Sequence, residues 1–244
     1  MEKENSIEFV VNGRRALFTD PISRIGGEKF TYQVPTYQAL KGILESIYWK
    51  PTFFWIVDRV RIVKQIHSES QAIRPIDYGG GNTLSIYSYL ADVEYQVKAH
   101  FEWNQNREDL IQDRNENKHY FIAKRSLEKG GRRDIFLGTR ECQGYVEPCI
   151  YGMGKGDYDD YSDFPLGVMF HGFTYSDEAV REEEKNKLTA RFWRPVMTYG
   201  ELIFPKPEEC DIRRILTDSK TKEFDLKDGN FSYAGGGVLD ELDE

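Results

Sequence analysis

Cysteine and histidine are both scarce in this chain of 244 residues. There are three cysteines, Cys142, Cys149 and Cys210. An odd number with no metal-ligand spacing is typical of reduced thiols rather than of disulfides or a zinc site. There are four histidines, His67, His100, His119 and His171, and they form no HxH or HExxH arrangement. We therefore expect no structural zinc.

Long apolar runs are also missing. No stretch approaches the roughly 18 apolar residues that a membrane-spanning helix needs. The first residues, MEKENSIEFVV, lack a basic region followed by an apolar one, which a secretory signal would show. We expect a cytoplasmic protein with no membrane partner.

The sequence contains no complete phosphate-binding loop, calcium-binding loop or hydrolase motif. GMGKGD, at residues 152–157, lacks the Lys-Ser/Thr ending of a phosphate-binding loop. DYDDYSD, at residues 157–163, has Tyr161 and Ser162 where a calcium loop needs a ligand and a glycine. No GxSxG elbow is present. We expect no bound metal and no cofactor.

Charge is present in quantity but unevenly placed. The net charge is −8, yet residues 1–140 hold 21 Lys and Arg against 18 Asp and Glu. Residues 117–133 are the most basic stretch, with Glu128 as their one acid and six basic residues: Lys118, Lys124, Arg125, Lys129, Arg132 and Arg133. A local positive field of this kind suits a nucleic acid. The alternative is a solvated helix face, the usual role of a charge run.

The first half of the chain alternates between strand and helix patterns. Residues 36–49 predict a helix, capped by Thr36, with apolar residues at 3.6-residue spacing. A second helix is predicted from residue 119 to Gly130–Gly131, and a possible one within 104–117. Strands are predicted at residues 6–13, 53–68, 90–103 and 133–148. The order βαββαβ is that of a ferredoxin-like domain, and the RNA-recognition motif shares it.

The second half has a different character. Residues 151–165 are rich in Gly and Asp, which predicts a loop. We expect a charged turn or short helix at 182–187 and a loose acidic tail at 231–244. Strands are predicted at residues 166–175 and within 189–204. The sequence therefore predicts an α+β protein with a ferredoxin-like domain at residues 1–140 and an antiparallel β-rich domain at 141–244.

Lys118 and His119 are the strongest candidates for chemistry. They follow polar residues 115–117, so we expect them at a helix N-terminus, where backbone N–H groups attract phosphate. Lysine can stabilise a developing oxyanion and histidine can exchange a proton near neutral pH. These are the groups needed to cleave RNA without a metal, by attack of a 2′-OH on the adjacent phosphorus. Tyr48 is a second candidate, either as a functional phenol or as core packing at a helix end.

Four stretches resemble one known family. GRRALFTDP, YQVPTYQALKGILESIYWKP, NKHYFIAKRS and RRDIFLGTRECQGYVEP look like the CRISPR-associated Cas-five family, type I-C (Dvulg) subtype, of the RAMP superfamily. The resemblance runs from about residue 6 to beyond 200. It implies a ferredoxin-like domain with a β-rich C-terminal part. It also implies a metal-independent endoribonuclease that cuts precursor CRISPR RNA at the base of each repeat hairpin.

The resemblance also implies which residues act and what they meet. Catalysis falls to a Tyr, a Lys and a His, which match Tyr48, Lys118 and His119. The enzyme would stay on the 5′ handle of the mature CRISPR RNA and join the type I-C backbone and large subunits. We expect eight residues to contact RNA phosphates: Lys124, Arg125, Lys129, Arg132, Arg133, Arg14, Arg15 and Arg24. The alternatives are a non-catalytic subunit that binds the 5′ handle, and a scaffold that does not contact RNA.

Overall fold

The computed structural model describes residues 5–21, 27–76 and 78–219. It is a mixed α/β structure in which all pairings between named strands are antiparallel. A seven-stranded sheet in the order β11-β2-β4-β1-β6-β5, with β3 also paired to β4, is the main framework. Its strands are β1 (Ser6–Ala16), β2 (Phe53–Ile62), β3 (His67–Ile73), β4 (Ser85–Trp103), β5 (Ile135–Phe136), β6 (Gln143–Pro148) and β11 (Glu201–Ile203).

Two helices pack on this sheet. Helix α1 (Tyr37–Ile47) contacts β2, and helix α2 (Glu116–Glu128) contacts β1 and β6. The predicted cap is confirmed, because the Thr36 side chain accepts a hydrogen bond from Ala39 N at 3.1 Å. Leu40, Ile43, Leu44 and Ile47 point from α1 into the core, as the 3.6-residue spacing predicts. Between β4 and α2 lies one 3₁₀ helix, η2 (Glu108–Asp113), rather than a full α-helix.

A smaller sheet covers the other side of α1. It has the order β12-β9-β8 and consists of β8 (Met169–Thr174), β9 (Lys187–Trp193) and β12 (Ile212–Asp218). Tyr37 of α1 stacks on His171 of β8 with ring centroids 4.2 Å apart. Lys41 of α1 donates to Glu178 at 2.5 Å. Strands β7 (Phe164–Pro165) and β10 (Val196–Met197) form a separate pair.

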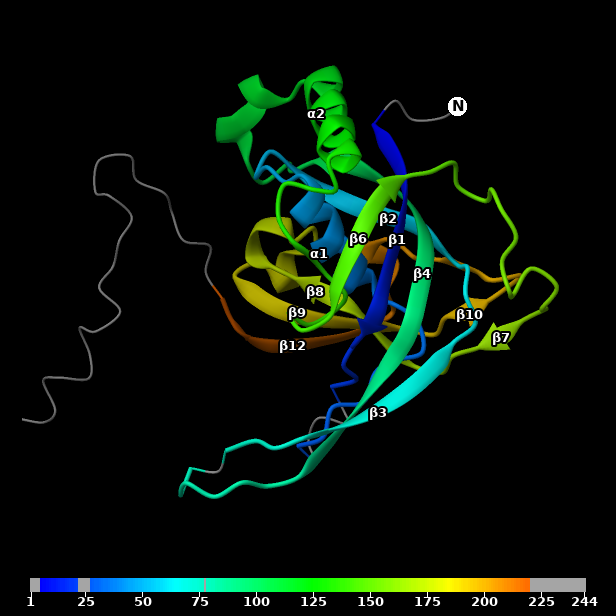
Figure 1. The fold of residues 1–244 in the computed structure, drawn as a ribbon. Helices are drawn as coiled ribbons and strands as arrows, with labels where there is room; N and C mark the ends of the chain where they lie inside the picture. The colour runs from blue at the N-terminus through cyan, green and yellow to red at the C-terminus, as the bar shows by residue number, and fades with distance from the viewer. Residues whose placement is uncertain (1–4, 22–26, 77, 220–244) are drawn as a thin grey trace, which may run out of the picture.

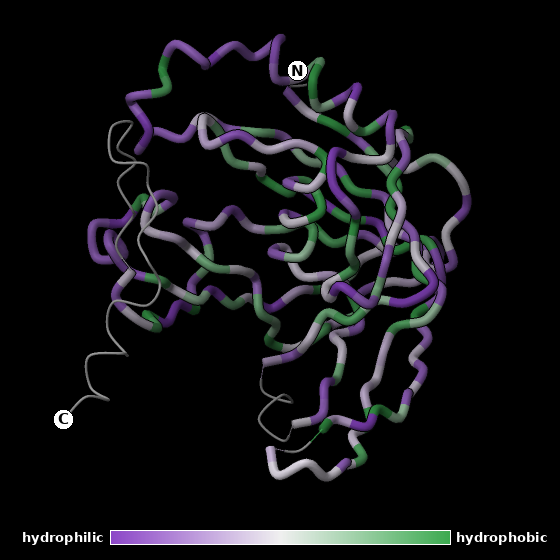
Figure 2. Tube along the Cα trace, turned by 60° about the vertical axis from the view of Figure 1, so that its left-hand side comes forward, coloured by the Kyte–Doolittle hydropathy of each residue, from purple (hydrophilic) through white to green (hydrophobic). Residues whose placement is uncertain are grey.

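Helix α2 and the paired strands β3 and β4 lie at opposite ends of the molecule. Figure 1 shows α2 at one end, while β3 and the first part of β4 extend together as an arm at the other. In Figure 2 the hydrophobic stretches gather where the elements pack, and the hydrophilic ones lie on outer loops. Among the described residues, no helix is long and apolar enough to cross a bilayer.

Some predicted strands differ from the observed ones. The prediction of one strand over residues 53–68 is wrong: β2 ends at Ile62, and β3 begins at His67 after a break. The predicted strand over 133–148 is a hairpin of β5 and β6, closed by Leu137 N donating to Cys142 O at 2.7 Å. The acidic tail, 231–244, lies outside the described residues.

The main sheet draws on both halves of the chain. Strand β6 pairs with β1, and β11 pairs with β2. A division at residue 140 therefore runs through the connection between β5 and β6, and it stays a prediction. The three cysteines, all described, are free thiols.

Candidate active site

Tyr48 is fixed where α1 ends. Its backbone N–H donates to Leu44 O at 2.9 Å, and its carbonyl accepts from the Trp55 indole at 2.8 Å. These bonds attach the residue to both the helix and β2. The ring is 1% exposed, so the core-packing role considered for Tyr48 is present in the structure.

His119 comes from the first turn of α2. Asn115 caps this helix, its side chain accepting from Lys118 N at 3.0 Å, so Lys118 and His119 do lie at a helix N-terminus. The imidazole is fully buried. Its ring packs edge-on against the rings of Phe53, Phe101 and Trp103.

Tyr48 and His119 meet directly. The Tyr48 hydroxyl lies 2.8 Å from His119 Nδ1, and His119 Nε2 lies 2.7 Å from the backbone carbonyl of Asp113. A carbonyl can only accept, so Nε2 carries a proton. In the neutral imidazole Nδ1 is then an acceptor, and the tyrosine hydroxyl donates to it. The geometry therefore assigns the tautomer.

Lys118 lies on the solvent side of the same turn. Its ammonium donates to Asp113 Oδ1 at 2.5 Å, while Thr52 Oγ1 donates to Asp113 Oδ2 at 2.7 Å. The hydrogen bond from Lys118, followed by that from Thr52, lowers the pKa of Asp113. Sequence reasoning missed Asp113. A carboxylate five residues before Lys118, just ahead of a capped helix, was the available signal.

The environment of Tyr48 opposes its ionisation. Burial raises the pKa of the phenol, and the negative charge of Asp113 raises it further. The Arg132 guanidinium, 5.6 Å from the centre of the Tyr48 ring, acts in the opposite direction. The pair can pass a proton between oxygen and nitrogen, but a free phenolate is disfavoured.

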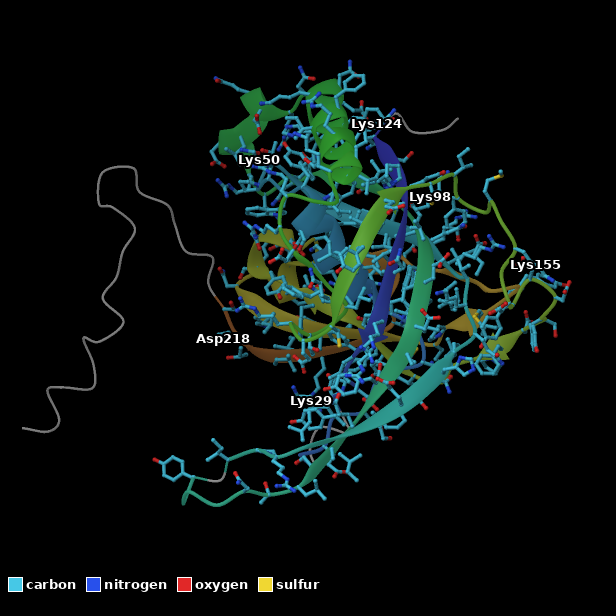
Figure 3. All side chains as sticks on the ribbon, viewed as in Figure 1. Lys29, Lys50, Lys98, Lys124, Lys155 and Asp218 are labelled. Atoms are coloured by element: carbon cyan, nitrogen blue, oxygen red, sulfur yellow. The ribbon has the colours of Figure 1, made fainter. Side chains whose placement is uncertain are left out.

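The predicted basic residues fall into two groups. Lys124, Arg125, Lys129, Arg132 and Arg133 are all exposed on or just after α2. The loop after α2 is tied to α1, because the backbone N–H groups of Arg132 and Arg133 both donate to Ser46 O at 3.1 Å. Gly131 precedes them with φ +105°, a conformation that only glycine adopts readily. Figure 3 shows Lys50 and Lys124 on this side of the molecule, near η2 and α2, and Lys155 far from them.

The remaining predicted basic residues lie elsewhere. Arg15 pairs in register with Ala91, whose other neighbour is His67 at the base of the arm. Its side chain is bonded to Glu69 and, at 2.8 Å, to Gln71. Arg14 is exposed beside it, and Arg24 lies outside the described residues. The structure thus does not bring Arg14 and Arg15 to the end of the molecule that holds Tyr48 and His119.

Phe53 and Trp49 have opposite environments, although both are close to Tyr48 in the chain. Phe53 is 1% exposed and packs on His119, so it belongs to the core. Trp49 is 46% exposed. No cluster of three or more His, Cys, Asp and Glu side chains with the geometry to hold a metal occurs in the described part of the chain.

Comparison with known proteins assigns this architecture to a family. The chain is similar to proteins named CRISPR pre-crRNA endoribonuclease Cas5d. It is 28% identical to that of Thermus thermophilus over 188 residues, covering 72% of this chain and 77% of the relative. It is 38% identical to that of Mannheimia succiniciproducens over 66 residues, covering 27% and 28%.

Two crystal structures have the same fold. One is described as a CRISPR-associated protein, with TM-score 0.72 and 40% identity over 86% of this chain and 96% of the other. The second is a functionally uncharacterized protein from Streptococcus mutans, with TM-score 0.70 and 42% identity over the same shares. A family model described as CRISPR-associated protein (Cas_Cas5) matches residues 6–205, and the chain therefore belongs to the Cas5 family.

Proposed function

We propose that this protein is a metal-independent endoribonuclease that cleaves precursor CRISPR RNA at the base of the repeat hairpin. The observation that carries the proposal is the 2.8 Å contact between Tyr48 and His119, with Lys118 next to His119 in the chain. A buried phenol bonded to an imidazole can move a proton, and the neighbouring ammonium can meet a phosphate. The names of the Thermus and Mannheimia relatives support the choice of RNA substrate.

The reaction needs one proton to travel from the 2′-OH to the leaving 5′-oxygen. As the 2′-oxygen bonds to phosphorus, its proton passes to the Tyr48 oxygen while Tyr48 gives its own proton to His119 Nδ1. Burial and the charge of Asp113 raise the pKa of Tyr48, which favours coupling of these two transfers over formation of a free phenolate. As the bond from phosphorus to the 5′-oxygen breaks, the proton returns from His119 through Tyr48 to that oxygen.

Lys118 has an electrostatic role in this scheme. Its ammonium neutralises the charge that builds on the phosphorane oxygens. The products are a 2′,3′-cyclic phosphate and a 5′-OH. Whether Tyr48 or His119 is regarded as base or acid then matters less, because they act as one relay.

The rival function is a non-catalytic subunit that holds the 5′ handle. The burial of His119 favours it, because a fully buried imidazole meets no phosphate in this state. The test is incubation of a labelled repeat hairpin with the protein in EDTA. Cleavage that falls about 10²–10⁴-fold in His119→Ala, with RNA affinity retained, supports the enzyme. His67→Ala, a change at an exposed histidine on the arm, is the matched control and should cut normally.

The absence of cutting by folded wild-type protein would leave the binding role. Loss of affinity in His119→Ala at an unchanged rate would have the same meaning.

The wider context of the chain belongs to the same proposal. The unit β1-α1-β2-β4-α2-β6 is ferredoxin-like, and its sheet order β2-β4-β1-β6 supports that. The unit carries the catalytic site, and the later strands form a β-rich part. Lys124, Arg125, Lys129, Arg132 and Arg133 hold the hairpin's phosphates, with Arg14, Arg15 and Arg24 as more distant contacts. After cleavage the protein stays on the 5′ handle in the cytoplasm and joins the type I-C backbone and large subunits.

A further inference from the structure

The groups that would act on RNA are all covered or engaged in this structure. Tyr48 is 1% exposed and His119 is not exposed at all. Three side chains, those of His119, Lys118 and Thr52, all form hydrogen bonds with one residue, Asp113. Its carbonyl accepts from His119 Nε2, and its carboxylate accepts from Lys118 and Thr52.

The Asp113 carboxylate has the surroundings of a bound phosphate. One oxygen lies 2.5 Å from Lys118 Nζ. The other lies 2.7 Å from Thr52 Oγ1 and 3.4 Å from His119 Nε2. An ammonium, a hydroxyl and an imidazole N–H are groups that hold a phosphate oxygen equally well. The site is therefore already arranged around an oxyanion, and that oxyanion belongs to the protein.

A phosphate cannot take up the Lys118 and Thr52 side chains while the Asp113 carboxylate is bonded to both of them. The residue covers the Nε2 edge of the imidazole, and Tyr48 covers the Nδ1 edge. Its negative charge would also repel a phosphate and cancel that of Lys118.

The segment that carries Asp113 is held by polar contacts rather than by buried side chains. No residue from 105 to 118 is buried. The Lys118 and Asp113 side chains are 49% and 29% exposed, and an ion pair so open to water is weak. Local opening occurs most readily in segments with few buried contacts. Exchange of the carboxylate for a phosphate breaks this exposed ion pair and the hydrogen bond from Thr52, and the phosphate offers oxygens to the same two side chains.

We propose that the Asp113 carboxylate occupies the subsite of the scissile phosphate, that RNA displaces it, and that Thr52 is a further phosphate-binding residue. This proposal rests on the proposed function for the identity of the ligand. Thr52 is 1% exposed and follows Pro51 after α1, and its hydroxyl meets the same carboxylate as Lys118 and His119. The occupant is an RNA phosphodiester, and Asp113 is its resident substitute.

The first test compares the affinities of variants for a repeat hairpin with a 2′-deoxy nucleotide at the scissile position, which cannot be cut. Asp113→Asn keeps an oxygen for Thr52 but removes the charge that holds Lys118. It should bind this hairpin about two- to fivefold more tightly than wild type, the equivalent of one exposed ion pair. Unchanged or weaker binding by folded Asp113→Asn would overturn the proposal and make Asp113 a positioning residue.

The second test separates Thr52 from its present partner. In an Asp113→Ala background Thr52 no longer has a carboxylate to support. Adding Thr52→Val should still weaken binding, about threefold or more, and adding Thr52→Ser should not. If Thr52→Val has no effect there, Thr52 serves Asp113 alone and the proposal fails.

Thermal unfolding of each variant verifies that it is folded. The proposed function is tested separately, on the unmodified hairpin. Suppose that the variants bind the deoxy hairpin in the expected order of affinities while the wild-type protein never cuts the unmodified one. That result would overturn the nuclease proposal and leave the phosphate subsite standing.

Discussion

The Tyr48 hydroxyl donates to His119 Nδ1 at 2.8 Å across a separation of 71 residues in sequence. The two side chains come from the end of one helix and the start of the other, and both are out of contact with water. The bond thus joins α1 to α2 as well as setting the proton on His119.

Removal of the Tyr48 hydroxyl should affect both stability and cleavage. In Tyr48→Phe the buried Nδ1 of His119 loses its donor, which should lower the free energy of unfolding by about 1–3 kcal/mol. Cleavage in EDTA should fall about 10²–10⁴-fold. Tyr37→Phe is the matched control, because Tyr37 is equally buried on α1 and donates to Trp55 O. It should be destabilised but cut at the normal rate; equal loss of cleavage in both variants would point to folding instead.

Lys118 and Lys124 should differ in what they contribute. Lys118→Ala should reduce the cleavage rate strongly and the unfolding free energy by less than about 1 kcal/mol, because its ion pair with Asp113 is half exposed. Lys124→Ala, on an exposed part of the same helix, should weaken binding with little effect on the rate at saturating protein. Single-turnover kinetics over a range of protein concentrations distinguish the two. A normal saturating rate in Lys118→Ala would contradict its role on the phosphorane.

Trp49 and Phe53 allow a test of stacking against packing. Trp49→Ala should leave the unfolding midpoint nearly unchanged and lower affinity for the hairpin about tenfold, the worth of one stacked base. Phe53→Ala should cost about 3–5 kcal/mol of stability, because it opens a cavity beside His119. Urea unfolding and gel-shift titration measure the two effects. Unchanged RNA affinity in Trp49→Ala would make this exposed ring a surface residue only.

His171 should make the protein sensitive to mild acid. Burial, and secondly the charge of Arg191, lower its pKa from 6.5 to about 3. Between these values the unfolded chain takes up a proton that the folded chain refuses, so stability falls as pH decreases from about 6.5 towards 3. The slope from this residue is at most about 1.4 kcal/mol per pH unit.

Urea unfolding at pH 7 and pH 5 measures this dependence. His171→Gln, which has no titrating group, should lose less stability between the two pH values than wild type. An identical loss in the two proteins would show that His171 is not the cause.

Local features of this fold were predictable from sequence, because they depend on neighbours in the chain. Thr36 caps α1 and Asn115 caps α2 through their own side chains, and the apolar spacing of α1 marks its buried face. Strand β12 was not predicted, since none of its residues is buried and no hydrophobic alternation marks it. The sequence predicted one strand in place of β2 and β3 because β-branched residues continue up to the break between them.

The site divides in the same way. The helix N-terminus at Lys118 was predictable from the polar residues before it. The partnership of Tyr48 with His119 depends on how α1 and α2 pack, and only family resemblance suggested it. Asp113 was missed because its position results from a 3₁₀ turn whose apolar residues, such as Ile111, stay exposed. No periodic pattern marks such a turn.

Strand β6, the partner of β1, has a consequence for the protein's synthesis. The sheet on which α2 rests is incomplete until residues 143–148 pair with β1, and these residues are made after Tyr48 and His119. A growing chain would then contain both residues before the packing that brings them into contact is complete. A chain that ends before residue 143 would therefore lack a strand on which α2 packs.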